Sequence, residues 1–592
     1  MAESQIKAAG WTEDTRREPG MNPDVLRARR NTVADLLSRS AARFPDKLAL
    51  AFREERLTYA QLDTRVNQTA HRFLADGLKR GMRLAVLSKN SLDFAVLVFA
   101  AARVGLTIVP INYMLTVPDI AYIIGHCAAD ALAAPVELAE KLEAAVRDAS
   151  ANREAAGTAD TGSLGTSHAA TGDLVKGAAG GIRGAAGSKG IAGGAKGSTV
   201  IARYLMQSSE SMKVGESAWQ PMRGANVRGM PTFDPEAPVY AADVAQILYT
   251  SGTESKPKGV MLTHDNLIAQ YVSVIVGGRM ESRDVCVHAL PLYHSAQLNC
   301  FLGPSVYLGS TGIVLEQADP ATILATVERE RVSQLFCPPT VWIALLCHPD
   351  FEKRDLSTLE KCYYGAAIMP MEVLKELSER LPGALFWNFY GQTEVAPLAT
   401  ALQPEDQMRK LGSAGQATLN VETRIVDDED NEVPRGTIGE IVHRTAHAML
   451  GYLNDPEKTA AAFQNGWFHS GDLGVMDEEG YITVVDRKKD MIKTGGINVS
   501  SREVEEAVYQ YPGVSEVAVI GVPDEYWIEA VTAIVVPKPG VTIDVAGLET
   551  YCKENLAAFK VPKRIIVVDG LPRNPSGKIL KRDLREQYKS LA

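Results

Sequence analysis

The stretch of sequence that says most about the fold lies at residues 244–259, which read Val-Ala-Gln-Ile-Leu-Tyr-Thr-Ser-Gly-Thr-Glu-Ser-Lys-Pro-Lys-Gly. Ala245 to Leu248 predict a short strand, and the hydroxyl, glycine and lysine residues from Thr250 to Gly259 predict a tight loop. Backbone N–H groups, hydroxyls and ammonium groups gathered in one loop can bind a polyphosphate. An ordinary turn would explain any three of these residues, but not the full run. Because the spacing differs from the Walker A pattern G-x-x-x-x-G-K-[ST], we expect a phosphate-binding loop of another type.

Upstream of this loop, helical and strand patterns alternate. Thr58 and Gln61 have the spacing of a capping box at the start of a helix, and Gly77 marks its end. The same reading predicts strands at residues 48–52, 84–87 and 107–109 and helices at residues 33–44, 58–76 and 91–104. Strands separated by helices of this length predict a mostly parallel sheet with helices on both faces.

Two later regions differ from this α/β pattern. Residues 153–198 consist mostly of Gly, Ala, Ser and Thr, which predicts a flexible insertion because little apolar surface is available to bury, and residues 199–243 stay undecided. Near the C-terminus, strands at 517–520, 531–536 and 565–568 and a helix at 545–556 predict a small α+β unit. We therefore expect a large N-terminal α/β domain at 1–485 with mostly parallel sheets flanked by helices, an uncertain low-complexity insertion at 153–235, a hinge at 486–489, and a small mobile α+β domain at 490–592.

Composition limits the function. The chain has 592 residues, of which 46% are hydrophobic and 23% charged, and its formal net charge is −10. The negative charge argues against a nucleic-acid partner, and the absence of an apolar run of about 20 residues argues against a transmembrane segment. Seven cysteines without a C-x-x-C pair indicate neither a disulfide framework nor a zinc site. No secretory signal is visible, so we expect a cytoplasmic protein, with peripheral membrane contact and oligomeric state left open.

Four further segments accompany the loop along the chain. They are Tyr390-Gly391-Gln392-Thr393-Glu394, Trp467–Asp472, Asp486–Lys493 followed by Gly495-Gly496, and Asn574-Pro575-Ser576-Gly577-Lys578. Together with the loop, in this order, they resemble the signatures of the adenylate-forming (ANL) superfamily, which includes acyl-CoA synthetases, peptide-synthetase adenylation domains and luciferases. Ser470 stands where the family has threonine. One such match could be chance, whereas five in order are specific.

The resemblance implies a two-step reaction. A carboxylate attacks the α-phosphorus of ATP to give acyl-AMP and pyrophosphate, and a thiol such as that of coenzyme A then takes the acyl group. Cations and aligned donors supply most of the catalysis because negative charge accumulates where the carboxylate meets the triphosphate. ATP, Mg²⁺ and coenzyme A are therefore the expected small molecules, together with a carboxylic acid.

The resemblance also assigns the nucleotide-binding residues. Expected to hold ATP are Thr250, Ser251, Gly252, Thr253, Glu254, Lys258, Gly365, Ala366, Ala367, Tyr390, Gly391, Gln392, Thr393, Asp472 and Arg487. Thr253 and Glu394 are the expected Mg²⁺ contacts, since a hard cation takes oxygen ligands. Outside their motifs, Glu394 would read as a solvated loop carboxylate and Asp472 as a turn aspartate. Ala366 stands where the family often has glycine, so its methyl group bears on the width of the acyl channel.

Three lysines and two glycines carry the expected catalytic cycle. Lys578 is the main catalytic candidate, because the resemblance places it on the α-phosphate and the acyl carboxylate. Without its Pro-Ser-Gly-Lys context, it would read as part of a solvated basic face. The resemblance further implies rotation of the C-terminal domain about Lys489, where many relatives carry aspartate. Gly495 and Gly496 would line the coenzyme A tunnel, or form a plain turn, and Lys493 is a secondary catalytic candidate.

One motif concerns the binding of the acid substrate. Pro291-Leu292-Tyr293-His294-Ser295 resembles the acyl-site loop of fatty and aryl acyl-CoA synthetases, where His294 would cap the pocket, although His294 could also be a core histidine. Relatives that activate amino acids carry an aspartate in this region, and none stands at Tyr293 to Ala296. We expect an AMP-forming acyl-CoA synthetase acting on a fatty acid. The alternatives are a cinnamate- or benzoate-type CoA ligase, an adenylation enzyme that loads a carrier protein or amine, and a catalytically inactive acyl-nucleotide sensor.

Overall fold

The structure is a computed structural model that describes most of the chain. The described residues are 23–161, 200–208, 210–222, 239–250, 256–367, 369–495, 497–524, 526–573 and 579–589. Six candidate site residues fall outside them: Ser251, Gly252, Thr253, Glu254, Gly496 and Lys578. No helix in the described ranges combines the length and apolar character needed to cross a bilayer.

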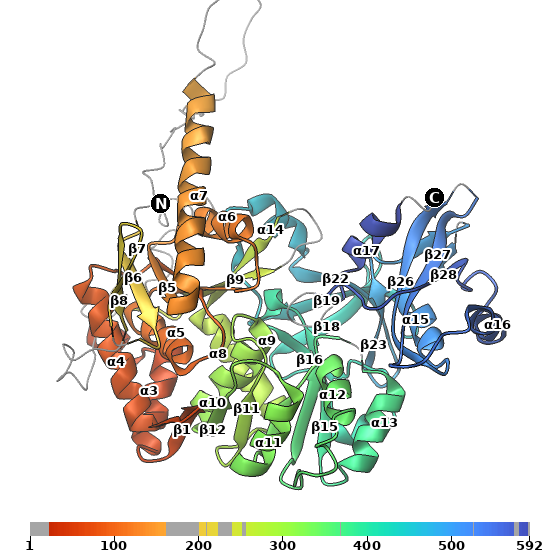
Figure 1. Cartoon of the computed structure of the whole chain (residues 1–592), viewed down its shortest axis with the longest axis horizontal. Helices are drawn as coiled ribbons and strands as arrows, with labels where there is room; N and C mark the ends of the chain where they lie inside the picture. The colour runs from red at the N-terminus through yellow and green to blue at the C-terminus, as the bar shows by residue number, and fades with distance from the viewer. Residues whose placement is uncertain are drawn as a thin grey trace, which may run out of the picture.

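Two nine-stranded sheets form the large α/β part of the molecule (Figure 1). In spatial order, the first contains β17 (Gln416–Ala417), β16 (Leu398–Leu402), β15 (Leu385–Gly391), β14 (Lys361–Gly365), β13 (Gln334–Phe336), β11 (Val285–His288), β12 (Thr311–Val314), β1 (Leu48–Phe52) and β2 (Glu55–Thr58). The second contains β20 (Gly451–Tyr452), β10 (Lys258–Thr263), β9 (Val244–Thr250), β4 (Thr107–Ile111), β3 (Arg83–Leu87), β5 (Ala131–Pro135), β6 (Ala202–Met206), β8 (Ser217–Pro221) and β7 (Met212–Val214). Strands β15 to β1 of the first sheet and β9 to β8 of the second pair in parallel.

Helices cover both sheets, as the α/β pattern predicts. They are α2 (Pro23–Ala28), α3 (Val33–Arg43), α4 (Tyr59–Ala75), α5 (Leu92–Val104), α6 (Val117–Cys127), α7 (Val136–Thr161), α8 (His264–Gly277), α9 (Ser295–Gln297), the π-helix η3 (Leu298–Leu302), α10 (Gly303–Leu308), α11 (Pro320–Glu330), α12 (Pro339–Leu346), α13 (Met371–Arg380), the 3-10 helices η4 (Thr393–Val395) and η5 (Pro404–Asp406), and α14 (Pro456–Ala462). Every residue of α5 is buried, in a core that includes residues of both large sheets. The predicted capping box is confirmed, since Thr58 Oγ1 accepts from Gln61 N and Gln61 Oε1 accepts from Thr58 N.

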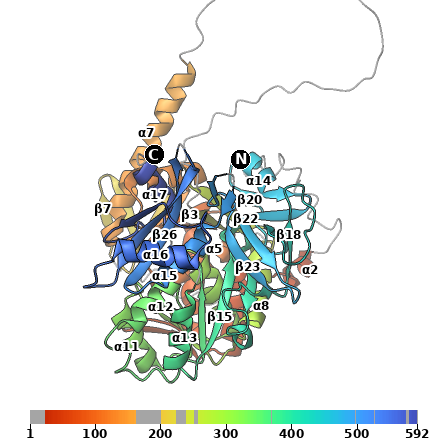
Figure 2. The ribbon, with the colours of Figure 1, turned by 90° about the vertical axis from the view of Figure 1, so that its right-hand side faces the viewer.

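Two smaller sheets follow. The third is antiparallel and contains β18 (Val421–Val426), β19 (Gly439–Thr445), β22 (Trp467–Met476), β21 (Phe463–Gln464) and β23 (Ile482–Arg487). The fourth contains β25 (Ile497–Val499), β24 (Ile492–Thr494), β27 (Ile528–Pro537), β26 (Val514–Asp524) and β28 (Arg564–Val567) and, with α15 (Ser501–Tyr509), α16 (Val545–Asn555) and α17 (Lys581–Tyr588), forms a small α+β unit, which Figure 2 shows in front. The fold class expected from the sequence is confirmed.

The structure differs from the expected insertion at 153–235. Helix α7 continues to Thr161 and projects from the body (Figure 1), and β6, β7 and β8 extend the second sheet within residues 202–221. Strand β6 pairs in parallel with β5, and its Tyr204, Leu205 and Met206 are buried. The sequence left residues 199–243 undecided, because the apolar runs there are short and the strand that pairs with β6 lies far away in the sequence.

Candidate active site

The nucleotide-binding candidates gather where the parallel strands of the first sheet end. Gly365 ends β14 and is followed by Ala366 and Ala367, while Tyr390 and Gly391 end β15. In open α/β sheets, ligands bind at the carboxyl ends of the strands. Both glycines are required by packing: a Cβ on Gly365 would lie 2.4 Å from the Phe389 carbonyl oxygen, and one on Gly391 would lie 1.9 Å from that of Pro397.

Ala366 adopts a backbone conformation that alanine rarely takes. Its φ is +63°, in the left-handed region, and its side chain lines a cavity described below. A residue with a Cβ pays roughly 1–2 kcal/mol there, which glycine avoids. The wall of the site therefore carries both a methyl group and local strain at the position where the sequence departs from the glycine common in the family.

Asp472 is held by donors from two different strands. The Tyr390 hydroxyl donates to Oδ2 at 2.8 Å, and Arg487 Nε lies 3.1 Å from Oδ1. Asp472 is only 6% exposed, and it pairs with Arg487 in the register of β22 and β23. Burial, and then the neighbouring Asp472 carboxylate, raise the pKa of Tyr390 well above its ordinary value. The Asp472 carboxyl group thus accepts from a neutral phenol and faces a guanidinium, and its remaining lone pairs can accept hydroxyl donors such as those of a ribose.

The segment around Asp472 is supported by short hydrogen bonds. Ser470 Oγ donates to the Ile441 carbonyl at 2.5 Å and accepts from Asp472 N at 3.0 Å, so a serine performs both contacts at the position where the family has threonine. Gln392 Nε2 donates to the Ser470 carbonyl at 3.2 Å. Gln392 therefore joins the end of the first sheet to β22.

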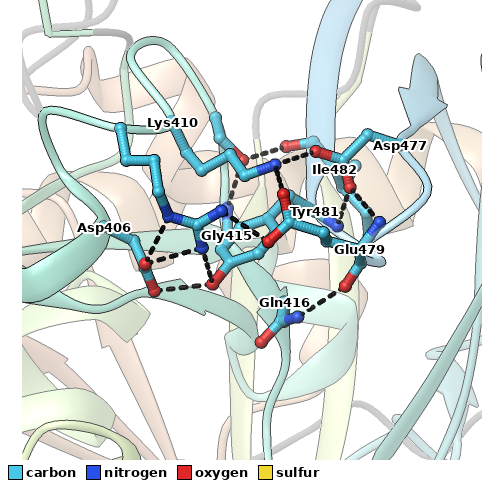
Figure 3. Close-up of polar contacts among 10 residues, drawn as sticks. Asp406, Lys410, Gly415, Gln416, Asp477, Glu479, Tyr481 and Ile482 are labelled. Atoms are coloured by element: carbon cyan, nitrogen blue, oxygen red, sulfur yellow. Dashed lines mark hydrogen bonds and ion pairs between the residues drawn. The ribbon is translucent and has the colours of Figure 1, made fainter.

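An ion network fastens the third sheet to the first (Figure 3). Lys410 Nζ lies 2.6 Å from both Asp477 and Glu479 in the turn between β22 and β23. Asp406 of η5 accepts from the Tyr481 hydroxyl at 2.6 Å and pairs with Arg409 at 2.8 Å. One exposed ion pair contributes little, but several linked pairs restrain the turn. The network thereby helps to hold β22 and β23, which carry Asp472 and Arg487, against the sheet that carries Tyr390.

Glu394 and Lys258 meet at one tyrosine. Tyr452 of β20 donates its hydroxyl to Glu394 Oε1 at 3.0 Å, and Lys258 Nζ lies 5.1 Å from the centre of the Tyr452 ring. Lys258 also pairs with Thr250 across the hairpin of β9 and β10, so the two ends of the predicted phosphate loop are adjacent. Tyr452 was missed because no motif surrounds it and its partner strands are remote in the sequence.

The described residues contain no group of three His, Cys, Asp or Glu side chains able to hold a metal by themselves. Magnesium needs no such group, because it keeps several waters and binds through one or two carboxylates together with phosphate oxygens. Glu394, located near Lys258 and the phosphate-loop hairpin, fits this pattern. There the ion would supply positive charge to the phosphate oxygens.

A cavity of about 180 Å³ extends along the carboxyl ends of the first sheet. Its wall includes Ala366 after β14, Phe336 and Pro338 at β13, Ala289 and Leu290 after β11, and Glu316 after β12, together with Asn90, Tyr113, Tyr293, His294, Thr340 and Val341. His294, the expected acyl-site residue, thus lies in the same cavity wall as Ala366. The neighbouring Ser295 hydroxyl lies 3.0 Å from that of Thr393, which connects this loop to the nucleotide residues.

Asn90 connects two loops of the cavity wall by hydrogen bonds. This role was not predicted from the sequence. Its Nδ2 donates to the carbonyls of Leu290 at 2.8 Å and Leu315 at 3.0 Å, and its Oδ1 accepts from Leu292 N at 2.8 Å. The side chain is 3% exposed. One asparagine after β3 of the second sheet therefore positions two loops of the first, including the residue next to Glu316.

The remaining candidates lie at or beyond the predicted hinge. Burial and the nearby Arg487 lower the pKa of Lys489 to about 8. Asp486 Oδ2 accepts from the backbone N–H and the hydroxyl of Ser501, both at 2.7 Å, and so ties β23 to the start of α15. Lys493 lies in β24, on the fourth sheet, and its backbone N–H donates to Glu529.

Gly495 follows Lys493 at the end of β24. Its φ is +56°, in the left-handed region that favours glycine, and a Cβ there would lie 3.4 Å from the Trp527 ring. Such a turn is compatible with an ordinary turn and with the predicted wall of the coenzyme A tunnel. Lys493 and Gly495 belong to the small α+β unit, across the predicted hinge from Asp472.

Comparison with known proteins agrees with this arrangement. The model of the AMP-binding enzyme family matches residues 37–453, and that of the AMP-binding enzyme C-terminal domain matches residues 503–578. The chain belongs to the AMP-binding enzyme family. It is an AMP-forming acid–CoA ligase, as the resemblance of its motifs implied.

Relatives of this AMP-binding enzyme differ in the acid that their names give. The feruloyl-CoA synthase of Amycolatopsis sp is 34% identical over 93% of this chain and 98% of its own length. The long-chain-fatty-acid–CoA ligase of Escherichia coli O6:H1 is 32% identical over 96% of each chain. Among solved structures, ATP-bound MatB from Rhodopseudomonas palustris has a TM-score of 0.76 and 29% identity, covering 95% of this chain and all of MatB.

Proposed function

We propose that this ligase activates a compact aryl acid, such as a benzoate- or cinnamate-type acid, and transfers it to coenzyme A. The observation that carries the proposal is the size of the cavity that runs from Ala366 to Glu316. A cavity of about 150 Å³ holds one benzene molecule, so a cavity of about 180 Å³ suits a ring with a short arm. The proposal therefore replaces the fatty acid favoured by the sequence with the aryl alternative.

The shape of the cavity supports the same conclusion. Its walls span the ends of four adjacent strands, β14, β13, β11 and β12. Three spacings of about 4.8 Å make this span roughly 14 Å. A long aliphatic chain would have to pass Glu316, whose ionised side chain stands at the far end. The feruloyl-CoA synthase relative, whose name denotes an aryl acid, is in accord with this assignment, whereas the long-chain relative names the competing class.

We assign the other residues to the two steps as follows. The acid oxygen attacks the α-phosphorus and pyrophosphate leaves, while Lys258, Thr250 and the loop between them hold the β- and γ-phosphates. Lys578 neutralises the charge that develops between the acid and the α-phosphate, and Glu394 with Thr253 holds Mg²⁺. In the second step the sulfur of coenzyme A attacks the acyl carbon and AMP leaves, after the C-terminal domain has turned at Lys489 so that Gly495 and Gly496 face the incoming thiol.

The test is pyrophosphate release from ATP and Mg²⁺ with a panel of benzoic, cinnamic, medium-chain and long-chain acids, with and without coenzyme A. We expect aryl acids to give the highest kcat/KM and an acyl-CoA product. A higher kcat/KM for long-chain acids would contradict the aryl assignment, and pyrophosphate release without thioester formation would indicate a carrier protein or amine as acceptor.

Glu394→Gln tests the magnesium assignment in the same assay. We expect it to raise the Mg²⁺ concentration needed for half-maximal rate about 10-fold, since one ionised ligand is lost. Glu405→Gln removes an exposed carboxylate that is paired with Arg279 and serves as the control. An unchanged Mg²⁺ requirement in Glu394→Gln would remove this residue from the metal site.

A further inference from the structure

The far end of the acyl cavity is lined by Glu316, a carboxylate held in ion pairs that the proposed reaction does not use. Glu316 follows β12, and its Oε1 lies 2.8 Å from Lys89 Nζ, while its Oε2 is paired with Arg53. Lys89 follows β3 of the second sheet and Arg53 follows β1 of the first. The cluster, hereafter the Glu316 cluster (Arg53, Lys89 and Glu316), therefore forms where the carboxyl ends of the two large sheets meet.

The Glu316 cluster separates two cavities. Glu316 and Asn90 line both the acyl cavity and a second, polar cavity of about 230 Å³, which is also lined by Arg53, Lys89 and Glu137. Because strand order places β12 three positions from β14, Glu316 lies at the opposite end of the acyl cavity from Ala366. An acid bound with its carboxylate near Ala366 and His294 would point its other end at Glu316.

The group that faces the acyl cavity at that end is a hydrogen-bond acceptor. Glu316 lines the acyl cavity, whereas Lys89 and Arg53 line only the second cavity. A carboxylate has acceptor capacity beyond its ion pairs, and the contact with Lys89 holds the pKa of Glu316 below its ordinary value, so the carboxylate is an acceptor at neutral pH. A hydroxyl group can donate to this acceptor, whereas a methyl group would desolvate the charge without supplying a hydrogen bond.

The ring portion of such an acid also has a counterpart. Lys89 Nζ lies 5.9 Å from the centre of the Tyr113 ring, and Tyr113 packs edge-on against Tyr293 with ring centres 6.0 Å apart. Both tyrosines line the acyl cavity. Within the described part of the chain, the buried Tyr293 hydroxyl has no hydrogen-bond partner, so water or a ligand has to supply one.

We propose that Glu316, held in place by Lys89, binds a hydroxyl group at the end of the acid opposite its carboxylate, so that the substrates are ring-hydroxylated aryl acids. This inference rests on the proposed aryl-acid function and adds its specificity-determining residues. Glu316 is the acceptor, and Lys89 is a positioning residue that orients the carboxylate through their 2.8 Å contact.

The experiment compares 4-hydroxycinnamate with 4-methylcinnamate, which has nearly the same shape, as substrates for pyrophosphate release and acyl-CoA formation. We expect the wild-type protein to favour the hydroxyl compound at least 10-fold in kcat/KM, because a site that hydrogen-bonds a substrate hydroxyl rejects the analogue that lacks it. Glu316→Leu should reduce this ratio at least 10-fold, chiefly by lowering kcat/KM for 4-hydroxycinnamate. Glu405→Leu, at an exposed carboxylate paired with Arg279, should leave the ratio unchanged.

Lys89→Met is the second variant. It tests the proposed hydroxyl binding if Glu316→Leu is inactive toward every acid. It should also lower the ratio, because the acceptor loses its orienting partner. A wild-type ratio near one, or a ratio unaffected by both substitutions, would overturn the inference while leaving an aryl-acid ligase intact. Activity confined to aliphatic acids would instead overturn the proposed function itself, so the two failures are distinguishable.

Discussion

The Tyr390 hydroxyl donates a 2.8 Å hydrogen bond to Asp472 Oδ2, although 82 positions separate the two residues in the sequence. Tyr390 ends β15 of the first sheet and Asp472 lies in β22 of the third. The contact joins two residues that the motifs predict to hold ATP. Because Arg487 contacts the other carboxylate oxygen, three side chains from three strands form one connected unit.

Tyr390→Phe tests this unit, because it removes the hydrogen bond to Asp472 and keeps the aromatic ring. We expect kcat/KM for ATP to fall about 10-fold, since a hydrogen bond to a charged group contributes about 1.5–3 kcal/mol. Steady-state pyrophosphate release at varied ATP measures the effect. Tyr364→Phe is the matched control: it removes a buried 2.7 Å hydrogen bond to Gln407 and should leave the ATP kinetics unchanged. Equal effects in both variants would contradict a specific role for Tyr390.

Ala366→Gly should relieve backbone strain and widen the acyl cavity. We expect the free energy of unfolding to rise by roughly 0.5–1 kcal/mol, because glycine adopts φ +63° freely but loses more entropy on folding. Acids with bulkier rings should gain in kcat/KM relative to benzoate-sized acids. Ala128→Gly, at φ +47° after α6, makes the same chemical change and should affect stability without affecting acid selectivity. An unchanged acid profile in Ala366→Gly would remove this methyl group from the specificity wall.

Lys489 should make the domain orientation depend on pH. Its pKa is lowered to about 8 here, so the protonated lysine disfavours this orientation relative to one in which the side chain reaches solvent. Raising the pH from 7 to 9 should therefore favour this orientation, which resonance energy transfer between one dye on each domain can follow.

Lys489→Met should abolish that pH response, because its side chain is neutral throughout. Lys488→Met is the control, since Asp428 and Glu440 pair with Lys488 and raise its pKa, so that it stays charged between pH 7 and 9. A response that persists in Lys489→Met, or disappears in Lys488→Met, would assign the effect to another group.

Lys578→Ala should separate the two half-reactions. We expect adenylation to fall at least 100-fold, the usual cost of removing a group that stabilises transition-state charge. Thioester formation from supplied acyl-AMP and coenzyme A should persist, because that step does not need the lysine at the α-phosphate. Lys589→Ala, which removes an exposed lysine paired with Glu586, is the control. Pyrophosphate release that survives in Lys578→Ala would exclude this lysine as the adenylation residue.

Much of the fold could be predicted from the sequence, because the patterns that predict it involve neighbouring residues. The strand at Leu48–Phe52 and the helix between Ser91 and Gly105 were predicted within a residue or two, since apolar periodicity, an N-cap and a left-handed C-cap act over a few neighbouring positions. The strands β6 to β8 could not be predicted, because β6 pairs with the distant strand β5, and β8 and β7 are added beyond it.

The sequence by itself determined the chemistry of this protein: five motifs in order imply adenylate formation, since each keeps its reactive residue types within a few positions. Only the tertiary structure decided which groups meet. The Tyr390–Asp472 contact, the clamp at Asn90 and the position of Glu316 at the end of the acyl cavity all depend on strand order and on the packing of one sheet against another. Such contacts join residues tens to hundreds of positions apart, and no local pattern encodes them, because the free energy that selects them comes from burial of the assembled core.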